Sequence, residues 1–350
     1  MTYHFTKATP ARQIAGLLAI LLLLFGLIPL ANAQTIKLAT LAPEGSGWMN
    51  EMRAGAKEIK ERTNGRVTFK FYGGGVMGND RTVLKKMRIG QLHGGAFTAN
   101  TLGKFQKDVL LYGMPMLFNN LEEVQFARDR MDDKLRKLLE QAGYVSFGFA
   151  SGGFAHIMSN RPVATLDDMH GLKVWVPDGD EISYGAVKAL GVSPVTMPLT
   201  DVLTGLQTEL IDTIIGPPNG TIILQWNTSV SYITELPLAY IFAALVIEKK
   251  YFDRIQAADQ AIVREVMERV YKVFEHQGNE DNQNAYKALL DDGMTSIPPD
   301  QDQIHQWYDA IQASNHELAA QGVVDPDMLD EIECLVTAYR AGNLEKDCNR

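Results

Sequence analysis

The amino-acid sequence predicts an α/β protein built from two domains and a long helix that spans them. Its 350 residues exceed the roughly 100–200 residues of one ordinary domain. Strand and helix patterns alternate along most of the chain, which is typical of α/β folds with a mainly parallel sheet. One helical pattern, over residues 257–292, is too long for a single small domain. The composition, 46% hydrophobic and 21% charged with a mean hydropathy of −0.10, excludes a disordered chain and a multi-span membrane protein.

The first 33 residues have the pattern of a secretory signal peptide. Lys7 and Arg12 supply the positive start, residues 14–30 carry no charge, and residues 31–33 (Ala-Asn-Ala) suit signal peptidase. We therefore expect the chain to be exported and its mature form to begin at Gln34. A membrane anchor is the alternative, but the uncharged stretch is short for a transmembrane span.

The first domain is expected over residues 34–152, together with about 242–280. Its patterns alternate in the order strand 35–41, helix from 49, strand 66–71 and helix 80–89. The strand at 66–71 (RVTFKF) alternates apolar and polar residues, as expected when one face of a sheet is buried.

The second domain is expected over residues 153–241, together with about 281–345. Its patterns alternate in the order strand 172–176, helix 183–190, strand 193–197, helix 200–207 and strand 211–215. Two further strands are expected at 143–150 and 157–161. In the pattern at 257–292, Ile262, Val266 and Val270 form an apolar stripe, so this helix is expected to span both domains.

The sequence carries no motif that argues for an enzyme, a cofactor or a metal. Residues 73–78 contain a formal G-x-G-x-x-G, but no carboxylate follows at the distance a dinucleotide needs, so a tight turn explains the glycines better. The acids Asp178, Asp180 and Glu181 lack the regular oxygen ligands of a calcium loop and fit a solvated turn. For an exported enzyme, the sequence offers only Glu44, His156 and Asp178 as loose candidates.

Charge and cysteine content limit the partners and the redox state. The net charge is −9 at pH 7, and no basic cluster is long enough to follow a phosphate backbone, so nucleic acid is not an expected partner. The two cysteines, Cys334 and Cys348, both lie near the C-terminus. In an exported chain we expect them to form one disulfide.

Several segments in order resemble the DctP-like solute-binding proteins of TRAP (tripartite ATP-independent periplasmic) transporters. The similarity runs from about residue 35 to about residue 319. Residues 166–174 (LDDMHGLKV) are close to the family's D-[LM]-x-G-L-K-[IV]. The other matching segments are 65–67 leading to 75–78 (GVMG), 114–118 (MPMLF), 159–163 (SNRPV), 189–191 (ALG), 197–198 (MP) and 206–212 (LQTELID).

The resemblance implies a fold of the periplasmic binding-protein type, with two α/β domains around a ligand cleft and a long helix that bridges them. It implies a periplasmic subunit that captures a small organic solute and delivers it to the small and large membrane subunits. It implies no catalysis and no cofactor. We expect a monomer or a weak dimer.

The chain departs from the family pattern at the positions that hold a substrate carboxylate. Family members usually place an arginine directly after the G-L-K-[IV] motif, where this chain has Trp175. A second arginine of some members falls at about Ala155, and the family's Glu-Asn-Pro becomes Ile215, Gly216 and Pro217. Since an indole cannot neutralise a carboxylate, we expect a ligand that is neutral, aromatic or largely hydrophobic.

The family positions place a set of residues at the expected cleft. The predicted ligand-binding residues are Glu44, Trp48, Phe97, Thr98, Phe154, His156, Trp175, Leu199, Gly216 and Asn219. For Trp175, ordinary core packing is the alternative role. Two other functions stay open. The protein could bind a small carboxylate through a positively charged group at another position than the family's arginine. Alternatively, it could be a periplasmic sensor that presents its ligand to a membrane receptor.

Overall fold

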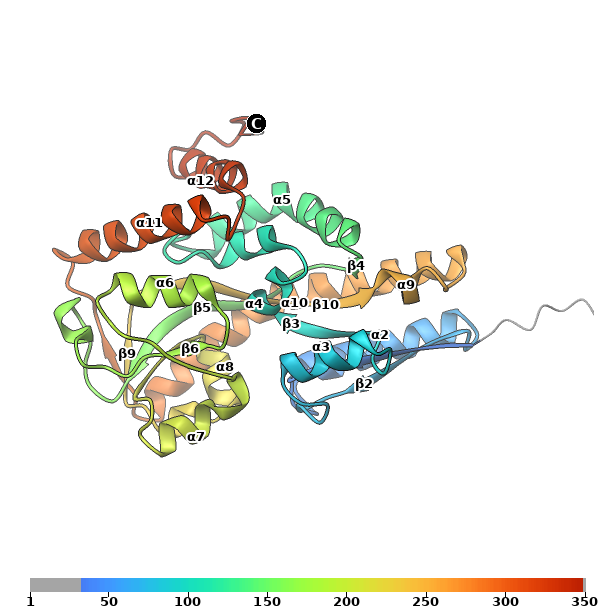
Figure 1. The fold of residues 1–350 in the computed structure, drawn as a ribbon, viewed down its shortest axis with the longest axis horizontal. Coiled ribbons are helices and arrows are strands. Elements are labelled where there is room, and N and C mark those ends of the chain that lie inside the picture. The colour runs from blue at the N-terminus through green and yellow to red at the C-terminus, as the bar shows by residue number, and fades with distance from the viewer. Residues whose placement is uncertain (1–32, 349–350) are drawn as a thin grey trace, which may run out of the picture.

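The computed structural model describes residues 33–348, so the predicted signal peptide lies outside the described residues except for Ala33. Nine strands form one sheet in the order β11-β9-β5-β10-β3-β1-β2, with β4 paired to β10 and β8 paired to β5. The sheet and its helices make two lobes (Figure 1). Lobe one holds β1, β2, β3 and the helices packed on them. Lobe two holds β6 to β9, β11 and α6 to α8.

Lobe one is built on parallel strands whose buried faces the sequence specifies. In β2, Val67, Phe69 and Phe71 are buried and the residues between them are not. Helix α2 begins after Ser46, whose Oγ accepts from the Met49 backbone nitrogen at 3.3 Å. The elements are β1 (Gln34–Ala39), α2 (Gly47–Arg62), β2 (Val67–Tyr72), α3 (Asp80–Arg88), β3 (Gly94–Thr98), α4 (Ala99–Gly103), η1 (Lys107–Gly113), α5 (Leu121–Gln141), β4 (Tyr144–Ser146) and α9 (Lys249–Phe252).

Two ten-residue strands run through both lobes. They are β5 (Ala150–Ser159) and β10 (Ala239–Glu248), which pair antiparallel with a register shift between Ile241 and Phe242. The second half of β5 then pairs with β8 and β9 of lobe two. The bounds of the strands predicted at 143–150 and 157–161 were wrong: the break falls at residues 147–149, between β4 and β5, and β5 runs unbroken from Ala150 to Ser159.

Lobe two places small sheets and short helices around the second half of β5. Its parallel pair, β6 with β7, joins the rest through a bridge between Val174 and Thr213. The elements are η2 (Asp167–Met169), β6 (Trp175–Pro177), α6 (Glu181–Ala189), β7 (Val195–Met197), η3 (Leu199–Asp201), α7 (Val202–Gln207), β8 (Thr213–Gly216), α8 (Pro218–Ile223), η4 (Trp226–Thr228), β9 (Tyr232–Thr234) and β11 (Thr295–Ile297).

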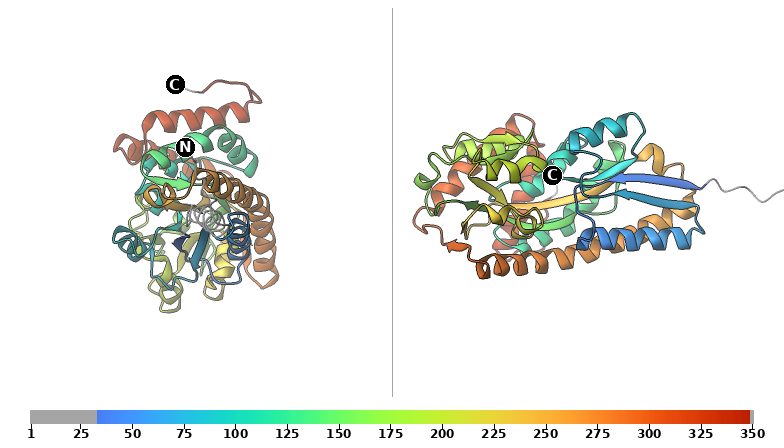
Figure 2. Two further views of the ribbon diagram at one scale, coloured as in Figure 1. Left: turned by 90° about the vertical axis from the view of Figure 1, so that its right-hand side faces the viewer. Right: turned by 90° about the horizontal axis from the view of Figure 1, so that it is seen from below.

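Helix α10 (Ala257–Asp291) has 35 residues and lies against both lobes. Figure 2 shows it running the length of the molecule, beside α2 at one end. Val266 and Val270 pack into the core of lobe one, whereas Leu289 packs into the cluster that contains Trp175 in lobe two. The apolar stripe therefore serves two separate cores, one at each end of the helix.

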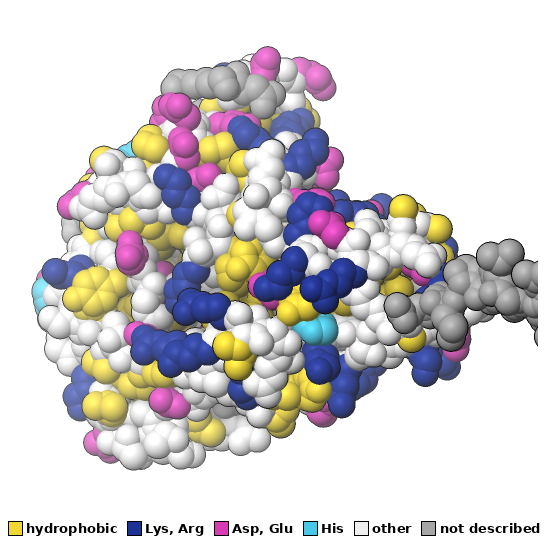
Figure 3. Space-filling view, turned by 45° about the vertical axis from the view of Figure 1, so that its right-hand side comes forward, with side chains coloured by type: hydrophobic (Ala, Val, Ile, Leu, Met, Phe, Trp, Pro, Cys, Tyr) yellow, Lys and Arg dark blue, Asp and Glu magenta, His cyan; other side chains and the backbone are white. Residues whose placement is uncertain are grey.

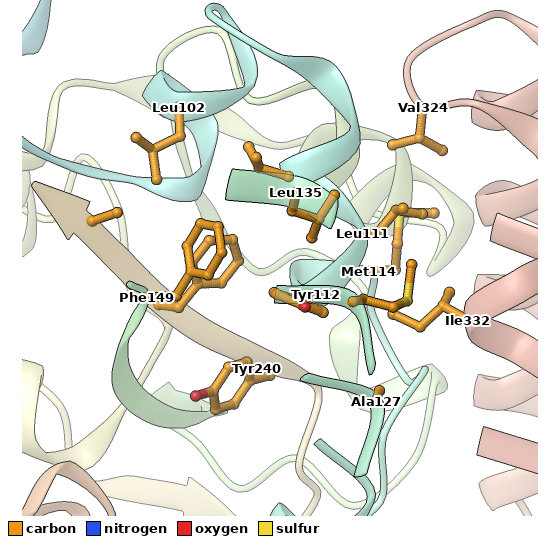
Figure 4. Close-up of a cluster of buried hydrophobic side chains, with 14 of the residues drawn as sticks. Leu102, Leu111, Tyr112, Met114, Ala127, Leu135, Phe149, Tyr240, Val324 and Ile332 are labelled. Carbon is orange, nitrogen blue, oxygen red and sulfur yellow. The ribbon is translucent and has the colours of Figure 1, made fainter. Parts of the chain in front are cut away.

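The C-terminal helices cross back over the lobes. α11 (Ile304–Ala320) packs against α6 of lobe two, and α12 (Pro326–Arg340) packs against α5 of lobe one. Cys334 of α12 and Cys348 form the expected disulfide. Residues of α12 such as Ile332 join a core that also contains Tyr240 of β10 (Figure 4). Two members of this core, Tyr240 and Phe242, also line the cavity described next.

Candidate functional site

A cavity of about 360 Å³ lies between the lobes. Lobe one contributes residues at the start of α3 and around α4 and η1, and lobe two contributes β6, α6 and the segments around η3 and α8. The middle of the wall comes from Leu238 and from the start of β10, as far as Phe242. A concave, mainly apolar cavity between domains is a frequent place for a small-molecule site.

Most of the cavity wall is apolar. Trp175 and Trp226 meet edge to face with ring centroids 5.3 Å apart. The Tyr240 hydroxyl is held by the buried Arg128, whose Nη1 lies 3.3 Å away. Other apolar side chains in the wall are Leu41, Leu110, Ile182, Val187, Leu199, Ile215, Leu224, Ile241 and Phe242.

Trp175 offers its ring to the cavity, but its N–H group is already engaged. The side chain is 5% exposed, and Nε1 donates to the Met197 backbone oxygen at 3.1 Å. Parallel pairing of β6 with β7 brings these two segments together. The indole therefore contributes apolar surface, with its one donor satisfied inside lobe two.

Charged side chains gather on part of the cavity lining. Arg81 of lobe one and Asp178 of lobe two form an ion pair with Nη2 and Oδ2 2.7 Å apart. Lys104 of lobe one carries the other positive charge among the lining residues, and its field acts on Asp80 and Asp180. The described lining residues thus include two cations and three carboxylates, so positive charge is matched at this site.

Two of the carboxylates lie at helix N-termini. Asp180 caps α6, where it accepts from the Ser183 backbone nitrogen at 3.0 Å and from its Oγ at 2.7 Å. Asp80 is in the first turn of α3 and accepts from Thr101 Oγ1 at 2.5 Å. Burial raises the pKa of both carboxyl groups, although the positive charge of Lys104 acts to lower it. The two helix N-termini thus each have a carboxyl group of the chain itself, and the helix dipole favours its ionised form.

The raised pKa of Asp180 predicts how a substitution changes the dependence of stability on pH. Because the folded state disfavours the carboxylate, Asp180 contributes more stability when protonated, and that contribution is lost as pH rises through its folded pKa. Asp180→Asn keeps an N-cap acceptor without the charge. We therefore expect the unfolding free energy of the variant, relative to that of the native chain, to increase as the pH rises from 4 to 7. Urea unfolding at several pH values measures this difference.

The matched control is Asp325→Asn, which changes the N-cap carboxylate of α12, away from the cavity. This control should not reproduce the gain. An Asp180→Asn protein whose stability follows pH as the native chain does would show that the buried carboxylate has no net cost at pH 7.

The structure brings some of the predicted ligand-binding residues together and leaves others elsewhere. Trp175, Thr98, Leu199 and Gly216 line the cavity. Asn219 is next to the lining residue Gly220, and its backbone nitrogen donates to Asn282 Oδ1 of α10 at 3.2 Å. For all of these residues, ligand contact stays a prediction.

The remaining predicted residues lie outside the cavity wall. Trp48 stacks on Phe274 of α10, and Glu44 pairs with Arg53 on the surface at 2.6 Å. Phe97 and Phe154 are buried against Phe105 and Tyr240, respectively. His156 Nδ1 lies 3.1 Å from the Thr234 backbone oxygen, and burial lowers its pKa. Their roles in ligand binding are likewise predictions.

Sequence reasoning did not select several residues that line the cavity, among them Arg81, Lys104, Asp180, Trp226 and Tyr240. Asp178 and Asp180 were interpreted as a solvated turn, whereas the structure places both on the cavity lining. Arg81 directly follows the N-terminus of a helix that starts after a glycine turn, a position at which parallel-sheet folds bind ligands. That signal was available in the sequence.

Over residues 33–348 the structure shows no group of His, Cys, Asp and Glu that could hold a metal ion. None of the helices in this part of the chain has both the length and the apolar character needed to cross a membrane.

Residues 38–321 match the family model for bacterial extracellular solute-binding protein, family 7, also called DctP. The chain belongs to this family. It is 24% identical over 261 residues to the C4-dicarboxylate-binding periplasmic protein DctP of Rhodobacter capsulatus, covering 73% of this chain and 76% of that protein. The resemblance to TRAP solute-binding proteins is thereby confirmed, and members of the family bind solutes for transporters rather than catalyse reactions.

Solved structures agree with the two-lobed fold. A TRAP periplasmic solute-binding protein from Ochrobactrum anthropi matches at 25% identity with a TM-score of 0.77, covering 90% of this chain and 98% of that one. One from Pseudomonas putida F1, with bound D-glucuronate, matches at 22% identity with a TM-score of 0.78, covering 85% and 96%. The predicted fold class is confirmed by these matches.

Proposed function

We propose that this TRAP solute-binding protein captures a neutral, aromatic or hydrophobic solute in the cavity between its lobes and delivers it to the small and large membrane subunits. We place this step in the periplasm, after export and cleavage of the signal peptide before Gln34. The observation that supports the ligand class is the lining itself: an apolar wall around Trp175, with positive charges that already face carboxylates.

The physical argument concerns the cost of burying an anion. A carboxylate moved from water into an apolar cavity loses several kcal/mol of solvation unless a cation and hydrogen bonds replace it. Arg81 is paired with Asp178, and Lys104 acts on Asp80 and Asp180. A neutral solute avoids this cost and gains from the apolar area it buries.

A small carboxylate is the second candidate ligand, and two observations favour it. The Pseudomonas putida homologue holds D-glucuronate, and the Rhodobacter capsulatus relative is named for C4-dicarboxylates. Basic side chains also gather over the middle of the face shown in Figure 3. In this case Arg81 or Lys104 would have to serve as the relocated anion clamp.

The proposed ligand class can be tested with N-phenyl-1-naphthylamine, a neutral aromatic probe that fluoresces in apolar surroundings. The mature chain, residues 34–350, should bind it and show saturable fluorescence. Leu199→Glu places a charge in the cavity wall and should weaken probe binding about tenfold or more, since the bound probe would remove water from an unpaired carboxylate. Leu210→Glu is the matched control, because Leu210 is 57% exposed and outside the lining.

Equal loss of probe binding in both variants, or no saturable binding by the native chain, would contradict a neutral apolar ligand in this cavity. A native chain that binds only carboxylates would support the second candidate.

We also propose that the chain forms domains at 34–152 with about 242–280, and at 153–241 with about 281–345, where α12 of the second domain packs on α5 of the first. Closure about a bound solute would then bend the chain where β5, β10 and α10 pass from one domain to the other. X-ray scattering of the mature chain with and without a bound solute should show a more compact form with solute. Identical profiles would contradict closure, and the same data report whether the chain is a monomer or a weak dimer.

A further inference from the structure

Two charged side chains from opposite lobes meet at the cavity. Arg81 lies in the first turn of α3 in lobe one, and Asp178 directly follows β6 in lobe two. Arg81 Nη2 lies 2.7 Å from Asp178 Oδ2. Asn100 of lobe one also donates through Nδ2 to the Asp178 backbone oxygen at 3.3 Å. Lobe one thus contacts both the side chain and the backbone of Asp178.

We propose that Asp178 determines solute specificity by occupying the guanidinium of Arg81 in place of a solute carboxylate. This inference rests on the proposed function, because it explains how the cavity of a family with acid-binding homologues excludes anionic solutes. Asp178 acts as an internal carboxylate that belongs to the opposite lobe and meets Arg81 when the lobes are together.

The chemistry of the pair supports this role. A guanidinium presents a planar set of donors that fits a carboxylate, so a free Arg81 on the cavity lining would be a suitable clamp for an organic acid. Asp178 is part of the same chain and is therefore present at a high effective concentration, which a dilute external carboxylate must exceed to displace it.

The other cation of the lining does not offer a comparable site. Lys104 lies where its positive charge acts on both Asp80 and Asp180, which come from opposite lobes. A solute carboxylate next to Lys104 would therefore also be near two carboxylates of the chain. Removal of one carboxylate, that of Asp178, would give the cavity an unpaired positive charge on Arg81. An unpaired charge on Lys104 would require the removal of two carboxylates, those of Asp80 and Asp180.

The Arg81–Asp178 pair is exposed, so substitutions there can change solute binding without changing the stability of the fold. The side chains of Arg81 and Asp178 are 71% and 44% exposed. Exposed ion pairs of this kind contribute little to folding, because water and salt screen them. Variants at these positions should therefore fold like the native chain, so that their binding can be compared directly.

The test uses the mature chain with D-glucuronate as the carboxylate probe and isothermal titration calorimetry as the readout. Asp178→Asn removes the charge with little change of shape and frees Arg81. We expect its glucuronate affinity to exceed that of the native chain by roughly twofold to fivefold, because water and salt screen the contacts of a largely exposed guanidinium. Asp178→Ala is a second variant that frees the same guanidinium, and circular-dichroism melting checks that each protein is folded.

The matched controls are Arg81→Gln and the double variant Arg81→Gln with Asp178→Asn. Both remove the ion pair between the lobes but contain no free guanidinium, so neither should gain glucuronate binding. The proposal is overturned if the native chain already binds glucuronate as tightly as Asp178→Asn. It is also overturned if neither Asp178 variant gains affinity, or if the double variant gains as much as the single one.

The probe N-phenyl-1-naphthylamine separates this inference from the proposed function. A native chain that fails to bind the neutral probe contradicts the proposed function. A gain of glucuronate binding in Asp178→Asn that Arg81→Gln abolishes would still support the role of Asp178.

Discussion

Replacing Trp175 by alanine is expected to lower the free energy of unfolding by about 3 kcal/mol, near the lower end for a buried tryptophan because one side of the ring borders the cavity. The substitution removes the edge-to-face contact with Trp226 and the hydrogen bond from Nε1 to the Met197 oxygen. Probe binding should fall with it, since Trp175 forms part of the apolar wall. Urea unfolding and fluorescence titration measure the two effects.

The matched variant is Trp175→Phe, which keeps an aromatic ring and loses the N–H group. We expect it to cost about 1 kcal/mol, the usual contribution of one hydrogen bond, and to retain most of the probe binding. If alanine at this position costs no more than phenylalanine does, the indole is not packed as the structure places it.

Replacing Gly278 by alanine should destabilise the chain, although alanine within a helix ordinarily stabilises it relative to glycine by about 1 kcal/mol. Gly278 lies in α10 where the helix passes β5, and a Cβ there would approach the Ser151 backbone oxygen to 2.6 Å. Because that oxygen belongs to a strand shared by both lobes, the helix or the strand must shift. We expect a loss of about 1–3 kcal/mol, the usual cost of overpacking.

The control for this change is Gln277→Ala, at the preceding, exposed position of the same helix. It should leave stability within about 0.5 kcal/mol of the native value, as surface substitutions usually do. A Gly278→Ala protein more stable than the native chain would contradict the close approach of α10 to β5.

The parts of the fold that depend on local pattern could be predicted from the sequence. Alternation at 66–71 corresponds to β2, and the apolar stripe of Val266 and Val270 corresponds to a buried face of α10. The break between the strands near 143–161 could not be placed from local pattern, because Gly152 and Gly153 are unfavourable within a strand and yet lie inside β5. In the structure they form the irregular part of the pairing between β5 and β10.

The site could be predicted only in part, since most of it is formed by contacts between distant segments. Position in the family pattern identified Trp175, but it did not show that its N–H group is bound to Met197. Arg81 and Asp178 lie 97 residues apart and meet only because the lobes are folded against each other.

The aromatic residues show a second limit of the sequence. The pattern cannot distinguish a ring that faces the cavity from one that faces a neighbouring core. Trp48, in the first turn of α2, packs on α10, whereas Trp226, at the start of the three-residue η4, lines the cavity. At the very start of an element, the pattern of apolar residues does not yet show which way a ring points.

The central claim is that this solute-binding protein holds a neutral apolar solute between its lobes. Thermal unfolding of the mature chain, with neutral aromatics such as indole and phenol beside carboxylates such as D-glucuronate and succinate, tests it most directly. A solute at 100 times its dissociation constant should stabilise the fold by about 2.7 kcal/mol, which raises the melting temperature measurably. We expect stabilisation by members of the neutral set and none by the carboxylates. Stabilisation by carboxylates alone would contradict the claim and assign the anion clamp to Arg81 or Lys104.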